Sequence, residues 1–301
     1  MITPQNGIFA QGTHSHYFLE LDILPGIATK DALWSLRGLG APDVSAGGVN
    51  FVIAFGADFW RAIAPDDAPA DLGKLQPPPR PDGKPSQAVP HDVWLWFNGS
   101  TPDVVFDKAR TAWLTVRDVT KLVSEQPCFV YRDSRDLTGF IDGTQNPGPL
   151  EAPTVALIPP GGPGAGGSHV LVMRWVHDLD AFHALPVEEQ ERIVGRTKHD
   201  SKELTREQRH PSGHLAKVQV DLDGKELEIY RRSVPYGTVA EHGLYFVAFS
   251  AERKRYDLLL ASMTGASGDG THDHLADFSH PVSAAYYFAP SLTSWRSCTV
   301  G

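Results

Sequence analysis

The feature that most constrains the fold of this chain is one order of strand-like and helix-like segments that occurs twice. In the first half, alternating or continuous apolar residues predict strands at residues 17–24, 49–55, 93–97 and 128–131. Apolar residues at helical spacing predict helices between them, at residues 29–37 and 101–119. The predicted order is therefore strand, helix, strand, strand, helix, strand.

The second half follows the same order. Strands are predicted at residues 170–176, 227–232, 244–249 and 284–289, and helices at residues 178–194 and 252–264. A long insertion, residues 196–223, separates the first helix from the second strand. This order is that of the ferredoxin-like fold, so we expect an α+β protein with a duplicated ferredoxin-like fold, whose antiparallel sheets carry helices on one face.

Residues rich in proline and glycine lie between the two units, at 146–149 and 159–164. Such segments favour turns and loops over regular structure. We therefore expect an N-terminal ferredoxin-like domain at residues 1–150 and a C-terminal one at residues 151–301. A further stretch rich in Pro, Asp and Gly, residues 63–90, predicts a long loop inside the first domain.

Charge and composition exclude several classes of function. The net charge of −9 argues against nucleic acid as a partner, because phosphate binding needs clustered Lys and Arg. No apolar run approaches the roughly 20 residues that cross a bilayer, so no membrane span is expected. The first residues lack a basic segment followed by an apolar one, so no secretory leader is expected.

The chain has two cysteines, Cys128 and Cys298. They do not form a C-x-x-C pair, so neither a zinc ribbon nor a covalently attached c-type haem is predicted. Such low cysteine usage suits a reducing compartment, and the predicted location is the cytoplasm.

The first segment that could carry chemistry is residues 139–147, Gly-Phe-Ile-Asp-Gly-Thr-Gln-Asn-Pro. Two glycines bracket Asp142, and glycine lets the backbone approach a ligand closely. Such a segment could hold the carboxylate of Asp142 beside a bound molecule. It could equally be a surface turn in which Asp142 bonds to its own backbone.

A second segment, residues 228–237, combines a predicted strand with a pair of arginines. Alternate residues of a strand share a face, so Arg231 and Ser233 are expected to point the same way. A fixed cation beside a hydroxyl suits an anion or a developing negative charge. The alternative is an edge strand whose arginines are solvated.

Histidines form the third group of candidates. His214 lies in the long insertion, and His272 and His274 lie together in a polar, glycine-rich stretch. The His-x-His pair is a candidate for a divalent metal, with an exposed loop as its alternative. A single histidine such as His214 is more often structural than a ligand, so the residues alone leave its role open.

Taken together, these segments resemble the dye-decolorising peroxidases, in particular the compact bacterial B-type group. Residues 139–143 match the family's G-x-x-D-G motif, and His214 matches its proximal haem histidine. Residues 231–237 match its distal arginine segment, and residues 275–279 match the late segment whose aspartate, here Asp277, supports the proximal histidine. The motifs lie in the family's order and span nearly the whole chain.

The resemblance implies haem b, bound non-covalently with one haem per chain. His214 would ligate the iron, and Asp277 would accept a hydrogen bond from the other ring nitrogen of His214. On the opposite face of the haem, Asp142 would act as base and then acid toward hydrogen peroxide, and Arg231 would stabilise the developing negative charge.

Further residues receive less specific roles from the resemblance. Ser233 would hold water or peroxide, although the family more often has asparagine there. The segment Gly143, Thr144 and Gln145 would lie near the haem edge or a propionate, and Arg231 would also contact the haem.

The implied activity is that of a peroxidase, which reduces hydrogen peroxide through a ferryl intermediate and oxidises dyes, phenolics or other small-molecule reductants. Large dyes would need electron transfer through surface aromatics, and the sequence selects none of the seven Trp and eight Tyr. A homo-oligomer is expected, as in much of the family. No tail resembles the peptide that docks some B-type members in encapsulin shells, so encapsulin docking is not expected.

Three alternatives stay open. Chlorite dismutases and haem-releasing enzymes share the fold, and fold does not determine function. A haem carrier or sensor would need His214 but not Asp142. A divalent-metal binder would instead use His272 and His274.

Overall fold

A computed structural model describes residues 2–45, 48–76, 88–222 and 224–298. The first half holds β1 (Ser15–Ile23), α1 (Thr29–Arg37), β2 (Val49–Phe55), α2 (Ala57–Ile63), β3 (Val93–Gly99), α3 (Pro102–Val116) and β4 (Thr120–Phe129). Its strands lie side by side in the order β4-β1-β3-β2, and every neighbouring pair is antiparallel.

The second half repeats this arrangement. Its elements are α4 (Ala152–Ala156), β5 (Ser168–His177), α5 (Leu179–Ala184), α6 (Val187–Val194), α7 (His214–Val218), β8 (Tyr230–Arg231), β9 (Val234–Gly237), β10 (His242–Ser250), α8 (Lys254–Met263), β11 (Ser279–Ala289) and α9 (Leu292–Ser297). The strand order β11-β5-β10-β8 matches the order of the first half. The duplicated ferredoxin-like prediction is therefore confirmed.

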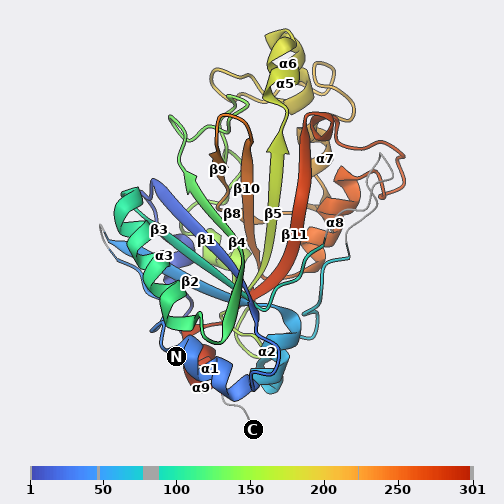
Figure 1. Cartoon of the computed structure of the whole chain (residues 1–301). Helices are drawn as coiled ribbons and strands as arrows, with labels where there is room; N and C mark the ends of the chain where they lie inside the picture. The colour runs from blue at the N-terminus through green and yellow to red at the C-terminus, as the bar shows by residue number, and fades with distance from the viewer. Residues whose placement is uncertain (1, 46–47, 77–87, 223, 299–301) are drawn as a thin grey trace.

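The two halves form one continuous sheet. A single residue pair, Phe55 of β2 and Phe288 of β11, joins them edge to edge. A small hairpin of β6 (Asp221–Leu222) and β7 (Lys225–Glu226) stands apart from this sheet, within the insertion. Short 3₁₀ turns lie at η1 (Asn6–Phe9), η2 (Pro65–Asp67) and η3 (His274–Asp277). Helices α1 and α9 lie at the end of the molecule opposite α5 and α6 (Figure 1).

Strand alternation explains how the core is layered. In β2, Phe51, Ile53 and Phe55 pack under the helices of the first half, while Val52 and Ala54 face the other way. Val52 and Ala54 belong to a second core layer, which is shared with the second half because it also contains buried residues of β5, β10 and β11. The side-chain period of two therefore buries both faces of the sheet.

Several predicted boundaries were wrong. The helix predicted at residues 101–119 ends at Val116, and the following strand begins at Thr120 instead of residue 128. This edge strand has polar side chains on both faces, such as Lys121 and Ser124, so its apolar residues do not alternate. The helix predicted at 178–194 is interrupted between Ala184 and Val187, where Pro186 is the N-cap of α6. Among the described residues, the strand predicted at 227–232 pairs only over Tyr230–Arg231.

The division near residue 150 stays a prediction, because the halves exchange segments. Helix α9 contributes Trp295 to the core of the first half, and residues 136–146 line a cavity of the second half. Of the loop predicted at residues 63–90, residues 77–87 lie outside the described part of the chain.

Candidate functional site

A cavity of about 480 Å³ lies on the helix-facing side of the second half's sheet. Its apolar wall is made by β5, β10, α7 and α8, through Leu171, Met173, Leu244, Phe246, Leu215, Val218, Leu259, Leu260 and Met263. Its polar groups come from the loop after β4, from the insertion and from the strand β8. All the candidate residues at positions 142–145, 214, 231 and 233 line it.

The loop after β4 holds Asp142 in a fixed turn. The amide of Asp142 donates to the Ser134 carbonyl at 2.9 Å, and its Oδ1 accepts from the Gly143 amide at 2.7 Å. Gly143 has φ +79°, a conformation that a residue with a Cβ rarely adopts. Arg135 ties the loop to the insertion, donating to the carbonyls of Gly139 and Lys198 at 2.9 and 2.6 Å.

The carboxyl of Asp142 is poised to carry a proton. Burial raises the pKa of Asp142; the positive charge of Arg231 acts against this shift, and the negative charge of Asp136 adds to it. A raised pKa moves an aspartate toward the range in which it can both accept and return a proton. The alternative of a turn in which Asp142 bonds to its own backbone is met in part, since Oδ1 accepts from the Gly143 amide, but the residue lines the cavity.

The Asp142 loop is joined directly to the arginine strand. The side-chain amide of Asn146 donates to the Arg231 carbonyl at 2.7 Å and accepts from the Arg231 amide at 2.8 Å. This pair of bonds copies the pairing of a neighbouring strand, across 85 positions of sequence. Asn146 was not singled out from the sequence, although it belongs to the motif that contains Asp142.

Arg231 and Ser233 both face the cavity, as strand alternation predicted. Burial lowers the pKa of Arg231 while Asp142 acts to raise it, and an arginine stays protonated at neutral pH in either case. The Ser233 hydroxyl accepts from the Val247 amide at 3.3 Å, which leaves its proton available to a molecule in the cavity. Strand β8 does lie at the edge of the sheet, as the alternative has it, but Arg231 lines the cavity.

His214 lines the same cavity from another element, as the first residue of α7. Its Nδ1 lies 2.6 Å from Oδ2 of Asp273, and among the described residues its Nε2 has no hydrogen-bond partner. Burial acts to lower the pKa of His214, but the Asp273 carboxylate outweighs it and raises the pKa. A ring held at Nδ1 by a carboxylate presents Nε2 as a metal ligand.

The expectation that Asp277 supports His214 was wrong. The carboxylate of Asp277 is bonded at 2.8 Å by both His272 and His274. Asp273 caps η3 through its Oδ1, which accepts from the Leu275 amide at 3.0 Å, and this leaves Oδ2 to face His214. The two aspartates lie four positions apart, so only the path of the chain decides which one reaches the histidine.

The metal alternative for His272 and His274 gains no support. Within the part of the chain that the structure describes, no group of three or more His, Cys, Asp or Glu is placed to hold a metal ion. Both imidazoles are instead engaged with Asp277, and His274 also stacks on His210 with ring centroids 4.6 Å apart.

A second polar cluster lines the cavity behind Asp142. His177 bonds to Ser279 through Nδ1 at 2.8 Å and to Asp136 through Nε2 at 3.1 Å. Burial acts to raise the pKa of Asp136, but the bonds from His177 and Thr138 outweigh it and hold the pKa low. Asp136 is therefore a fixed negative charge that bears on Asp142.

A cation stands at the edge of the cavity that Gly143, Thr144 and Gln145 line. Arg196 is held by the Ser201 carbonyl at 2.8 Å and by Glu203 at 2.6 Å, and its side chain is 13% exposed. A cavity with an apolar wall, an imidazole on one side and a buried cation near the edge suits a flat apolar cofactor that carries carboxylates.

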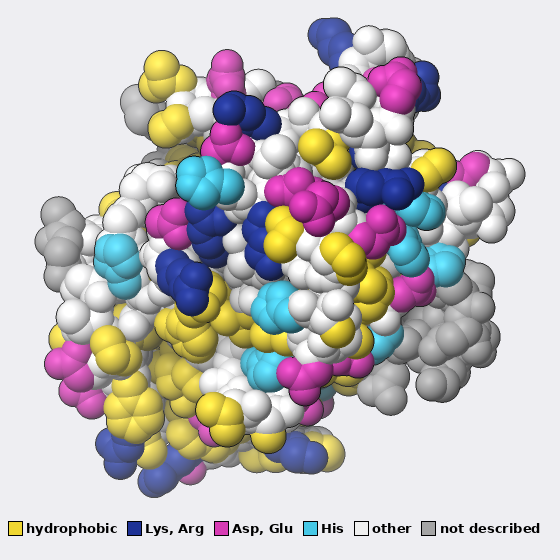
Figure 2. Space-filling model, turned by 90° about the horizontal axis from the view of Figure 1, so that it is seen from above, with side chains coloured by type: hydrophobic (Ala, Val, Ile, Leu, Met, Phe, Trp, Pro, Cys, Tyr) yellow, Lys and Arg dark blue, Asp and Glu magenta, His cyan; other side chains and the backbone are white. Residues whose placement is uncertain are grey.

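The distribution of charged side chains on one face of the molecule agrees with the acidic net charge of the sequence. On the face seen in Figure 2, acidic, basic and histidine side chains are interspersed, and the described residues there form no continuous basic surface. Among the described residues no helix is long and apolar enough to cross a membrane.

Comparison with known proteins gives consistent matches. A family model described as Dyp-type peroxidase, C-terminal, matches residues 133–294. A dye-decolorizing peroxidase of Mycobacterium tuberculosis is 32% identical over 248 residues, which cover 81% of this chain and 74% of that protein. One of Rhodococcus erythropolis is 30% identical over 278 residues, which cover 88% and 79%.

Solved structures agree over almost the full length. A dye-decolorizing protein from Vibrio cholerae has a TM-score of 0.88 at 32% identity, covering 98% of this chain and 99% of that one. A variant of DypB from Rhodococcus jostii, solved in complex with heme, has a TM-score of 0.88 at 29% identity and covers 98% of both chains.

Proposed function

This chain belongs to the dye-decolorising peroxidase family, and on that premise we propose that it is a haem b peroxidase in which His214 ligates the iron and Asp142, with Arg231, cleaves hydrogen peroxide. The cofactor is haem, bound non-covalently with one per chain. When bound, the haem would supply the redox chemistry that reduces hydrogen peroxide and oxidises dyes, phenolics or other small donors.

The observation that carries the proposal is the division of the cavity between two kinds of polar group. One side offers Nε2 of His214, whose Nδ1 bonds to Asp273 at 2.6 Å. The other residues that face the cavity include a carboxylate of raised pKa, Asp142, beside the cation Arg231. The apolar lining of the cavity supports a haem ring there, and Arg196, which also lines the cavity, would meet the haem carboxylates.

The polar residues then divide the work on peroxide. Asp142 takes the proton from one oxygen of hydrogen peroxide and delivers it to the other oxygen, which leaves as water. It therefore acts first as a base and then as an acid. Arg231 stabilises the negative charge that develops as the O–O bond breaks. Ser233 holds peroxide or water by a hydrogen bond, and Gly143, Thr144 and Gln145 border the haem.

A haem carrier or sensor is the second candidate, and a haem-releasing enzyme of the same fold the third. Neither needs a carboxylate of raised pKa facing the cavity beside an arginine, so Asp142 favours peroxide cleavage. A homo-oligomer without encapsulin docking, small-molecule reductants and a cytoplasmic location stay predictions.

The test is the visible spectrum of the protein reconstituted with haem, before and after stoichiometric hydrogen peroxide. We expect a strong Soret band that shifts on addition of peroxide in the wild type, and a band that is displaced or lost in His214→Ala. His272→Ala, which changes a histidine outside the cavity lining, should match the wild type. A wild-type chain that takes up no haem, or an Asp142→Ala variant that reacts with peroxide at the wild-type rate, contradicts the proposal.

A further inference from the structure

We propose that Lys217 is a positioning residue of the haem site, which holds the segment before Asp273 against α7 and thereby keeps Asp273 on His214. The consequence for haem rests on the proposed function, whereas the contacts belong to the chain itself. Lys217 carries a charge but is only 2% exposed, and the reaction described above does not use it.

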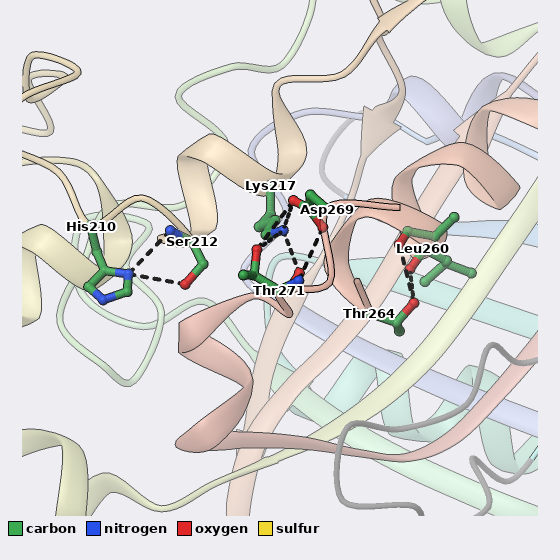
Figure 3. Close-up of polar contacts among 8 residues, drawn as sticks. His210, Ser212, Lys217, Leu260, Thr264, Asp269 and Thr271 are labelled. Atoms are coloured by element: carbon green, nitrogen blue, oxygen red, sulfur yellow. Dashed lines mark hydrogen bonds and ion pairs between the residues drawn. The ribbon is translucent and has the colours of Figure 1, made fainter. Parts of the chain in front are cut away.

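Every proton of the Lys217 ammonium has an acceptor. Nζ donates to Oδ2 of Asp269 at 2.5 Å, to the Thr271 carbonyl at 2.5 Å and to the Thr271 hydroxyl at 2.8 Å (Figure 3). An ammonium has three donors, so this site is saturated. All the acceptors come from one short segment, residues 269–271, which belongs to the connection between α8 and η3.

The geometry links the two members of the proximal pair. Lys217 lies three residues after His214 on α7, so both side chains leave the same side of the helix. On the other side of the contact, Asp273 follows Thr271 by two residues. Holding Thr271 to α7 therefore limits how far Asp273 can move from His214.

The segment that carries Asp273 depends on such ties because it has no helix or strand of its own. Gly265, Gly268 and Gly270 in this connection have positive φ angles, a conformation that favours glycine. Its other ties include backbone bonds from the Ser267 amide to the Ala261 carbonyl at 3.1 Å, and from the Asp273 amide to the Met263 carbonyl and the His274 amide to the Ser212 carbonyl, each at 2.8 Å.

A purely structural role would not require a charge at this position. The neighbouring buried positions of α7 include Leu215, and an apolar residue at 217 would avoid the cost of removing an ammonium from water. Lys217 provides three directed bonds that an apolar side chain cannot make. The charge is balanced by Asp269, so the pair fixes geometry and adds little net field at the haem.

The expected effect acts through the hydrogen bond to His214. A firmly held Asp273 raises the basicity of the imidazole, and such outer partners are worth roughly 10–100-fold in metal affinity. Removing the bonds between Lys217 and residues 269–271 should weaken haem binding, as Asp273→Asn would, but by a smaller factor. We expect haem affinity to fall by about tenfold.

The experiment removes the ion pair without changing the net charge. We would compare Lys217→Met/Asp269→Asn with Lys74→Met/Asp58→Asn, which deletes an exposed pair of the same residue types in the first half. Two quantities would be measured: amide hydrogen exchange of residues 265–278, and the iron–histidine stretching frequency in the resonance Raman spectrum of the ferrous haem protein.

We expect the Lys217 double variant to exchange the Asp273 and His274 amides faster and to lower the stretching frequency, with no change in the control. Unchanged exchange of these amides would show that Lys217 does not hold the segment that carries Asp273. Faster exchange with an unchanged frequency would make Lys217 structural only and overturn the positioning role. If the double variant does not fold, Thr271→Val removes one of the three acceptors and should change the exchange rates and the stretching frequency in the same directions by smaller amounts. A Thr271→Val variant with wild-type exchange rates and frequency would overturn the proposal.

The two proposals fail in different ways. A wild-type chain with no iron–histidine band contradicts the proposed function and, with it, the consequence of Lys217 for haem. The exchange measurement on the chain without haem then still decides whether Lys217 holds Asp273.

Discussion

The two halves of this molecule share one strand order, yet one is filled and the other hollow. In the first half, α1 and α3 cover the sheet, and Leu95 and Phe97 of β3 are at most 1% exposed. In the second half, the helix-facing residues Leu244 and Phe246 of β10 are half-buried and line the cavity.

The difference comes from where the first helix of each unit packs. Helix α1 lies on its own sheet, whereas α5 and α6 pack around Phe140 and Phe182 in a separate cluster (Figure 1). The insertion then brings α7 and His214 to the cavity. In the second half, therefore, the first helical segment does not cover the sheet, and the insertion with α7 covers part of it instead, which leaves space for a cavity.

The largest expected effect is on chemistry in the hollow half. Asp142→Asn should slow the reaction with hydrogen peroxide by roughly 10²–10⁴-fold, because that is the usual contribution of a general base. Stopped-flow spectroscopy of the haem protein measures this rate. Asp92→Asn is the matched change in the filled half, where burial also raises the pKa of the carboxyl, and it should leave the rate unchanged. Equal losses in the two variants would remove Asp142 from the mechanism.

For stability, we expect the larger loss from a substitution in the filled first half. Phe97→Ala should lower the free energy of unfolding by about 3–5 kcal/mol, because it opens a cavity in a packed core. Phe246→Ala should cost clearly less, since its ring already borders a cavity. Urea unfolding of both variants without haem, analysed at constant m value, makes the comparison. Costs of similar size would mean that the second half is as tightly packed as the first.

The two aspartates near His214 provide a sharper comparison within the hollow half. Asp273→Asn should weaken haem binding by roughly 10–100-fold, as expected when the partner of a ligating histidine is removed. Asp277→Asn should have little effect, because the partners of this half-exposed carboxylate among the described residues are His272 and His274, and His214 is not one of them. Haem titration followed at the Soret band measures both. The reverse order would restore Asp277 as the partner of His214.

The smallest expected effect is a displacement of the pH profile. Peroxide cleavage needs Asp142 as the carboxylate, so kcat/KM should rise with pH through the raised pKa of Asp142. The negative charge of Asp136 contributes to that raised pKa, so Asp136→Asn should lower it and move the acid limb to lower pH. Asp180→Asn, an exposed change on α5, should not move the limb. A limb that stays in place or moves to higher pH would contradict the influence of Asp136.

Much of the fold and part of the site could be predicted because they depend on local patterns. A run of apolar residues located β2 at Val49–Phe55 without error, and the segment predicted to be helical up to residue 194 ends there, before Gly195 with φ +91°. The start of β4 could not be located, because polar residues on both faces of this edge strand, such as Lys121 and Ser124, remove the apolar alternation.

By itself, the sequence determined the duplicated order of elements and the short segments that hold Asp142, His214 and Arg231. Each depends on residue types within a few positions of one another. Only the tertiary structure decided that Asp273 and not Asp277 meets His214, and that Asn146 pairs with Arg231. Those contacts join residues 59 and 85 positions apart, and side-chain reach over such separations is set by the packing of the whole chain.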